Sequence, residues 1–251
     1  MAETQDTYVN LSGITRLLRF ALWVGIVLAV VNTGSDLLEI QLLEKVAAGG
    51  GITDEEADVN DMRQLLLGGV AFVVFLVTAV VFLRWIYIAK RNARSFHPGE
   101  LKYTPGWSVG WFFIPFANLW KPYDALKETF QASDPEYTDN WRAADPPSLL
   151  PFWWALWLLS GLVGQILFRW SMKADSLDEL IYTDWVQIVS NGLDVILILV
   201  VLSLIGKLSG YQGRTFRKLE AQARARESAQ ENALTAEGGL SGAGEASITP
   251  V

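Results

Sequence analysis

The sequence predicts an all-α membrane protein with four transmembrane helices and an aromatic segment between the second and the third of them. Half of its 251 residues are hydrophobic, eleven are Trp, and the mean hydropathy is positive. Four apolar stretches each have about the 20 residues that a helix needs to cross a bilayer. Basic and acidic loops alternate between these stretches, as they do in proteins that cross the membrane several times.

The four predicted spans cover residues of about 20–40, 65–83, 148–168 and 185–205. The second half of the first span is diluted by polar residues, and residues 20–31 alone resemble the core of a signal peptide. The leader before this core is acidic, however, and no small-residue cleavage site follows it cleanly. We therefore expect an uncleaved first span.

The distribution of charge gives the predicted spans an orientation. Lys and Arg are concentrated in the loop between the second and third spans, which has eight, and in the tail, which has six, whereas the leader and the other two loops have two each. Acidic residues dominate the other two loops, with Asp54 to Asp61 in the first and Asp175 to Glu179 in the third. By the positive-inside rule, we expect a multi-pass protein of the cell membrane, with both termini and the aromatic segment in the cytoplasm.

The aromatic segment runs from Tyr103 to Tyr123, and its continuous apolar part has about 14 residues, too few for a span. Aromatic rings with a polar edge settle at the level of the lipid headgroups. Pro115 suits a segment that lies on the membrane surface as well as a re-entrant one that dips into the bilayer, so both alternatives stay open. The residues expected to form this interfacial or docking loop are Trp107, Trp111, Phe112, Pro115, Asn118, Trp120, Pro122 and Tyr123.

Helices are expected on both sides of the aromatic segment. The second transmembrane helix keeps its helical spacing for about two turns past the lipid and ends near His97, which we expect to be a solvated turn residue. Pro122 suits the first turn of the other helix. Tyr123, Leu126 and Phe130 share one face of that helix, which predicts an amphipathic helix that lies along the membrane.

Polar residues inside the predicted spans form a second candidate site. Asp194 is the deepest, about 14 Å along its helix from Trp185, and a charged carboxylate at that depth costs about 3 kcal/mol or more. Arg169 is the nearest expected cation, near the outer interface. The members of this intramembrane polar cluster, all expected in the outer half of the bilayer, are Asn32, Asp36, Glu39, Gln165, Arg169, Gln187, Asn191 and Asp194. They predict either an outward-open cavity for a small polar ligand, protons or cations, or interhelical hydrogen bonds that hold the bundle together.

The rarer side chains argue against most catalytic and metal sites. The chain has no Cys, which excludes disulfides, thiolate catalysis and Cys-ligated metals, and its single His argues against a His-based metal site. No Gly-rich phosphate loop and no metal-ligand spacing accompanies that His. We therefore expect no catalytic residues, no metal, no cofactor and no nucleic-acid partner, and we do not expect an enzyme.

Three strings of the sequence are unusually specific. They are WIYIAKRN at 85–92, YTPGWSVGWFFIPFANLWKPY at 103–123 and FWWALW at 152–157, with Trp141 between the last two. Together they resemble the bacterial domain of unknown function 4328 family. The resemblance extends from about the first span to the fourth and implies a multi-pass bacterial membrane protein, of the inner membrane. It implies no activity, so no catalytic residue follows from it.

The expected organisation has three parts. A cytoplasmic leader covers 1–16, a four-helix transmembrane domain covers 17–219 with its interfacial loop at 103–133, and a cytoplasmic tail covers 220–251. The tail lacks the apolar residues that a core requires, so we expect a short helix over 220–231 and disorder from about Asn232.

Two functions from different classes stay open. In the first, a non-enzymatic integral membrane protein docks a partner or senses the membrane through its cytoplasmic aromatic loop. In the second, the bundle is a small oligomeric transporter or channel that uses an outer-half polar cavity centred on Asp194. The lipid bilayer is a partner in both, and another protein or further copies of the chain are candidates.

Overall fold

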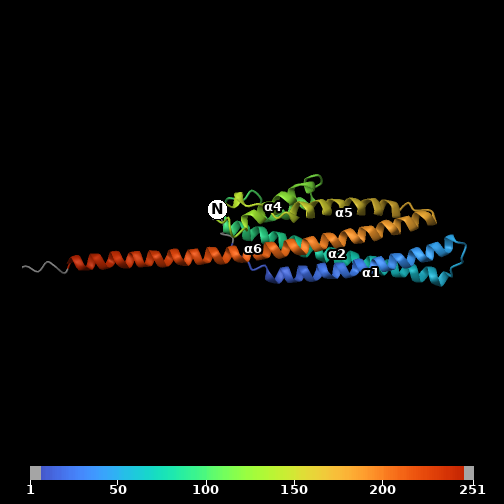
Figure 1. Ribbon diagram of the computed structural model, residues 1–251, viewed down its shortest axis with the longest axis horizontal. Coiled ribbons are helices and arrows are strands. Elements are labelled where there is room, and N and C mark those ends of the chain that lie inside the picture. The colour runs from blue at the N-terminus through green and yellow to red at the C-terminus, as the bar shows by residue number, and fades with distance from the viewer. Residues whose placement is uncertain (1–6, 246–251) are drawn as a thin grey trace, which may run out of the picture.

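The computed structural model describes residues 7–245, and every regular element in this range is a helix. The helices that are long and apolar enough to cross a membrane are α1 (Ser12–Ala47), α2 (Asp54–Phe96), α5 (Leu149–Ser171) and α6 (Leu177–Glu245). They lie side by side in an elongated bundle, and successive helices run in opposite directions (Figure 1). The predicted all-α class with four such helices is confirmed.

α2 begins well before the predicted apolar span. Thr53 caps it, because the backbone N–H of Glu56 donates to Thr53 Oγ1 at 3.1 Å and the N–H of Thr53 donates to Glu56 Oε2 at 2.9 Å. This reciprocal capping box satisfies two donors that the start of a helix otherwise leaves unpaired. Much of the predicted first loop is therefore helical, and α2 continues without a break to Phe96.

The chain between α2 and α5 folds into short helices against the bundle. These are α3 (Pro105–Gly110), the 3-10 turns η1 (Trp111–Phe113) and η2 (Ala117–Leu119), then α4 (Lys121–Ala132) and η3 (Trp141–Ala143). α4 coincides with the predicted amphipathic helix, with Pro122 in its first turn. Leu126 and Phe130 are buried on its inner face, which packs on the long helices.

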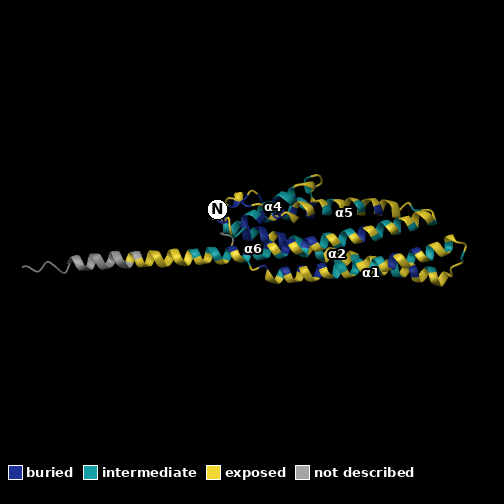
Figure 2. Ribbon diagram, viewed as in Figure 1, coloured by how far each residue is buried: buried dark blue, intermediate teal, exposed yellow. Residues whose placement is uncertain are grey.

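The buried core lies at the end of the bundle where these short helices pack. Trp85 of α2, Phe130 of α4 and Trp153 of α5 are nearly inaccessible and belong to one cluster. Buried residues concentrate there in Figure 2, whereas the rest of the bundle is largely exposed. None of the most apolar stretch of α2 is buried, and residues such as Phe72 point outward. An exposed helix that is apolar all round is suited to lipid rather than water.

α6 continues past the bundle as a single helix to Glu245 (Figure 1). The sequence predicts a short helix over 220–231 and disorder after it, and this prediction is wrong because the helix is longer. The Ala, Glu, Arg and Gln residues of this stretch have high intrinsic helix propensity. Residues 1–6 and 246–251, which belong to the predicted leader and tail, lie outside the described residues.

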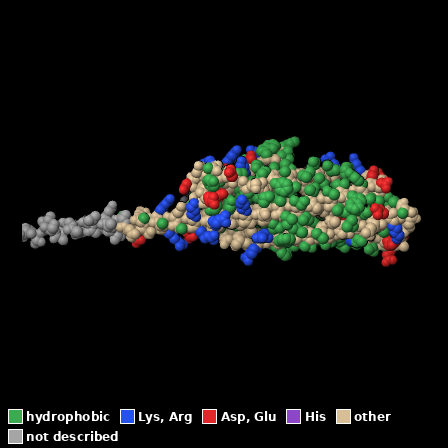
Figure 3. All heavy atoms as spheres, viewed as in Figure 1, with side chains coloured by type: hydrophobic (Ala, Val, Ile, Leu, Met, Phe, Trp, Pro, Cys, Tyr) green, Lys and Arg blue, Asp and Glu red, His purple; other side chains and the backbone are tan. Residues whose placement is uncertain are grey.

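Charged side chains separate toward the two ends of the bundle (Figure 3). Acidic residues gather where α1 turns into α2 and α5 turns into α6. Lys and Arg gather at the opposite end, around α4 and where α6 leaves the bundle, and an apolar band lies between. We call these the acidic end and the basic end.

Candidate functional site

The aromatic segment folds back along α5 at the basic end. Phe112 packs against Phe82 of α2 and Trp157 of α5, with ring centroids 6.4 and 6.0 Å away. Trp154 Nε1 donates a hydrogen bond to the carbonyl oxygen of Leu119 at 3.0 Å. The segment is therefore held against two of the four long helices.

The tip of the segment exposes large apolar side chains. Phe113 is 71% exposed and Phe116 is 77% exposed, and Trp107, Leu119 and Trp120 are each about half exposed. In Figure 3 an apolar protrusion stands out from the bundle where Figure 1 places this segment. We call these five side chains the exposed apolar tip.

The backbone at the tip is strained. Phe116, which follows Pro115, has a φ of 64°, in a region that bulky residues rarely occupy. Such conformations persist where the surrounding structure fixes them, and they cluster at functional sites. Among the other predicted loop residues, Pro115 is exposed, Pro122 is buried, and Trp111, Phe112, Asn118 and Tyr123 are partly buried.

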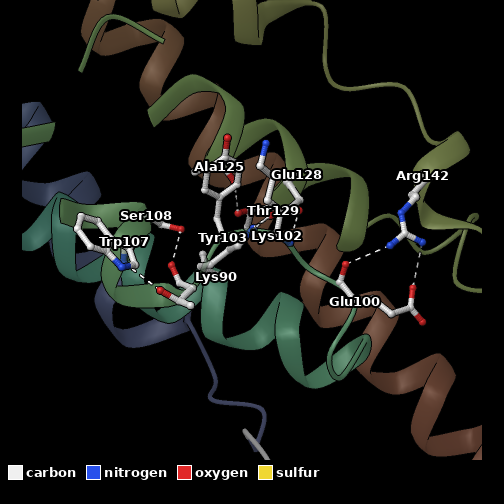
Figure 4. A network of polar contacts seen from close by, with 12 residues as sticks. Lys90, Glu100, Lys102, Tyr103, Trp107, Ser108, Ala125, Glu128, Thr129 and Arg142 are labelled. Carbon is white, nitrogen blue, oxygen red and sulfur yellow. Dashed lines mark hydrogen bonds and ion pairs between the residues drawn. The ribbon is translucent and has the colours of Figure 1, made fainter. Parts of the chain in front are cut away.

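Glu128 of α4 fixes the start of the aromatic segment (Figure 4). Its carboxylate accepts hydrogen bonds from the backbone N–H of Lys102 at 2.7 Å and of Tyr103 at 3.1 Å, and it forms an ion pair with Lys90 of α2. The Lys90 side chain is fully buried, and burial lowers the pKa of its ammonium group to about 8, although the Glu128 carboxylate opposes this shift. Loss of one partner of a buried ion pair is strongly destabilising, so this contact ties the segment firmly to α2.

Buried amides join α2, α4 and α6 behind the segment. Asn92 Nδ2 donates to Gln212 Oε1 at 2.9 Å. Gln212 Nε2 in turn donates to the Ala89 carbonyl at 2.7 Å and to Ser133 Oγ at 3.0 Å. The Thr215 hydroxyl donates to the Ser133 carbonyl at 2.7 Å. This network was not predicted from the sequence, where the three-residue spacing of Gln212 and Thr215 is its available signal.

His97 is buried, so the prediction of a solvated turn residue is wrong. Its Nε2 lies 3.1 Å from the carbonyl oxygen of Ala132, and its ring lies 5.9 Å from that of Trp141. Burial lowers the pKa of the imidazole. Trp141 also donates its indole N–H to Glu100 at 2.9 Å, because η3 folds back over the end of α2 and covers the turn.

At the acidic end, three predicted polar residues meet between α1 and α6. Asn191 Nδ2 donates to Asp36 Oδ2 at 3.1 Å and to Thr33 Oγ1 at 3.3 Å. Gln187 Nε2 donates to Asn191 Oδ1 at 3.1 Å. Asp36 and Asn191 are buried, so these bonds link two helices away from solvent.

Glu39 contacts α2 instead. Its carboxylate accepts hydrogen bonds from Asn60 Nδ2 at 3.2 Å and from Gln64 Nε2. The Arg63 guanidinium donates to Ser35 Oγ at 2.9 Å and to Asn60 Oδ1 at 2.5 Å. The three α2 residues were not predicted as part of the site, because they precede the apolar stretch that marks the second span in the sequence. Their helical spacing is the signal that could have found them.

The other predicted polar residues lie apart from this group. The Ser160 hydroxyl of α5 donates to Asp194 Oδ1 of α6. Gln165 and Arg169 are exposed on α5, and Asn32 is partly buried on α1. The structure therefore places five of the eight predicted residues in three separate groups of interhelical hydrogen bonds, and the other three lie outside these groups. Within residues 7–245, no group of three His, Cys, Asp or Glu residues is placed to hold a metal ion.

Comparison with known proteins gives one match. The family model described as "Domain of unknown function (DUF4328)" matches residues 48–210. The match covers α2, the aromatic segment, α5 and the first part of α6, but it begins after α1, which the resemblance in the sequence had included. No curated protein and no solved structure matches the chain.

Proposed function

The chain belongs to the domain of unknown function 4328 family, and we propose that it is a non-enzymatic integral membrane protein whose aromatic segment engages the cytoplasmic leaflet of a bacterial cell membrane. The exposed apolar tip is the observation that carries this proposal. Rings such as Phe113 and Phe116 cost free energy in water, at about 25 cal/mol for each Å² of apolar surface. Lipid is the solvent that removes this cost.

The position of the tip along the bundle supports lipid contact. The tip protrudes where the apolar band meets the basic end (Figure 3). By the positive-inside rule the basic end belongs in the cytoplasm, and Trp and Tyr are enriched at this boundary of membrane proteins. The tip therefore has the composition and the position of a membrane-interface contact.

The packing of the segment favours one that dips below the headgroups. Phe112 touches Trp157, which lies about 12 Å along α5 from the start of that helix at Leu149. Irregular backbone is tolerated at membrane depth where protein covers it, and here Trp154 of α5 bonds the carbonyl of Leu119. We propose a shallow re-entrant segment rather than one that lies flat on the surface.

The polar contacts behind the tip hold it rigidly against the bundle. This rigidity favours a role in sensing the membrane or in fixing the protein to it. Glu128 forms an ion pair with Lys90 of α2, and Gln212 of α6 donates to the Ala89 carbonyl of α2 and to Ser133 Oγ at the end of α4. A change in the packing of the inner leaflet at the tip would therefore act on α2 and α6 through buried contacts. This coupling is part of the proposal.

The proposal can be tested by the reaction of single cysteines in native membranes, because the chain has no Cys of its own. The test compares Phe116→Cys with Asp139→Cys, an exposed position of the loop after α4. We expect an aqueous maleimide reagent to label position 139 rapidly and position 116 slowly. Fast labelling at 116 in the membrane would contradict the proposal.

A small oligomeric transporter or channel is the alternative function. The contact that favours it is the Ser160 hydroxyl bond to Asp194, which holds a carboxylate between two long helices. Intramembrane acids are functional candidates by default. The contacts of Asp36 and Glu39 give it less support, because these acids bond to neighbouring helices as in interhelical packing.

A further inference from the structure

Two polar atoms of the aromatic segment are buried without a hydrogen-bond partner among the described residues. They are the hydroxyl of Tyr103 and the indole Nε1 of Trp111. Tyr103 as a whole is 7% exposed. Buried polar side chains nearly always have a partner, so each of these donors requires an explanation.

Ammonium groups lie over both rings. Lys121 Nζ is 5.9 Å from the ring centroid of Tyr103 and 5.8 Å from that of Trp111. Lys102 Nζ is 5.3 Å from the ring centroid of Tyr103. In the part of the chain that the structure describes, neither ammonium group has an ion pair or a hydrogen bond. Lys90 Nζ also lies 5.8 Å from the Tyr103 ring centroid, but it is paired with Glu128. Two ammonium groups without an ion pair and two neutral donors therefore lie around these rings.

The nearby acid does not neutralise these charges. Glu128 is committed to Lys90 and to the backbone N–H groups of Lys102 and Tyr103 (Figure 4). The N-terminus of α4, which begins at Lys121, has no side-chain cap and adds the positive end of a helix dipole. Asp124 lies in the same first turn, so the lysines must supply most of the attraction for an anion.

We propose that Lys102, Tyr103, Trp111 and Lys121 form a binding site for a phosphate group at the membrane boundary. Lys is a common phosphate ligand that acts as a point charge. The phenol and indole groups would donate further hydrogen bonds to the phosphate oxygens. The lysine side chains lie over the rings and have four rotatable bonds, so they open the site by swinging aside. The exposed apolar tip next to the site would place an anionic lipid headgroup there, and a free phosphate ion would satisfy the same donors.

The inference deepens the proposed function and rests on it for the identity of the lipid, but the two can fail separately. A headgroup site can exist while position 116 reacts as a water-exposed cysteine. Conversely, slow labelling at position 116 without a preference for the anionic lipid would support the proposed function and contradict the phosphate site.

The test measures lipid retention by native mass spectrometry of the full chain in a nonionic detergent. Phosphatidylglycerol and phosphatidylcholine with identical acyl chains are titrated separately into wild type, Lys121→Gln and Tyr103→Phe. Lys127→Gln on the same helix is the matched control, because it removes the same charge away from the two rings. A second arm adds inorganic phosphate to the complex with phosphatidylglycerol.

We expect wild type and Lys127→Gln to prefer phosphatidylglycerol, and Lys121→Gln to bind it about tenfold more weakly. Tyr103→Phe should weaken binding without lowering the melting temperature, because the hydroxyl has no protein partner to lose. Displacement by inorganic phosphate would assign the site to the free ion, and resistance to it would assign the site to the lipid headgroup. Equal retention of both lipids by wild type, or wild-type preference in both site variants, would overturn the inference.

Discussion

Trp154 of α5 holds the tip of the aromatic segment through a single hydrogen bond, from its indole N–H to the carbonyl oxygen of Leu119 at 3.0 Å. The bond joins residues 35 positions apart in the sequence. It also stands between the exposed apolar tip and the buried core, because Trp154 is itself buried in that core. The rigidity of the segment therefore depends on a residue outside it.

Replacement of Trp154 by Phe should loosen the tip without unfolding the bundle. The variant keeps an aromatic ring but removes the donor to Leu119, a loss of about 1 kcal/mol. We expect amide hydrogen exchange over residues 113–121 to become about fivefold faster. Trp170→Phe, at the far end of α5, is the matched control. Unchanged exchange in Trp154→Phe would show that this bond does not hold the tip.

Gln212 should be among the most sensitive positions of the chain. Gln212→Ala removes one hydrogen-bond acceptor of Asn92, and it leaves the Ala89 carbonyl and the Ser133 hydroxyl without the Gln212 amide. We expect the free energy of unfolding to fall by about 2–4 kcal/mol, measured by denaturant titration in detergent. Gln230→Ala, on the exposed part of the same helix, should change it by less than about 0.5 kcal/mol. Equal effects at the two positions would contradict the buried network.

Lys90 should make the stability of the protein depend on pH in the alkaline range. Its pKa is lowered by burial from 10.5 to about 8, so between these values the unfolded chain binds more protons than the folded one. The free energy of unfolding should therefore rise as the pH increases from about 8 to 10.5. Below about pH 8, Lys90 should contribute no pH dependence to it.

The Lys90→Met variant isolates this contribution. It should lack the rise that wild type shows, in unfolding titrations at several pH values across the window. Lys127→Met on α4 serves as the control and should keep the rise. A Lys90→Met variant with the pH dependence of wild type would exclude Lys90 as its source.

Asp194→Asn separates the proposed function from the transporter alternative. Asn keeps the size of the side chain and an oxygen that can accept the Ser160 hydroxyl. We expect reconstituted wild type and variant to show the same background proton and cation flux in proteoliposomes. A wild-type flux that the variant abolishes would favour the transporter.

The long elements of the fold followed from the sequence, because hydrophobic length and periodicity are local properties. α5 matches its predicted span closely, and α4 has the predicted Pro122 in its first turn. The start of α2 did not follow, because the Thr53 capping box lies in an acidic stretch that reads as a loop between spans.

The contacts of the candidate site were harder to predict than its members. The aromatic segment was identified from its composition, but its bond to Trp154 and the burial of His97 depend on how the chain folds back. The partner of Glu39 depends likewise on the register between α1 and α2. Such long-range pairings carry no periodic signal in a single sequence.

The depth of the tip in the bilayer tests the central claim most directly. Single nitroxide labels at Leu65, Phe72 and Val80, all exposed along α2, provide a ruler across the apolar band. The ratio of oxygen to nickel-chelate accessibility at each label gives its depth in a reconstituted bilayer. We predict that a label at Phe116 lies below the headgroups, between the depth of Val80 and the aqueous value at Asp139. An aqueous accessibility at Phe116 equal to that at Asp139 would contradict the account.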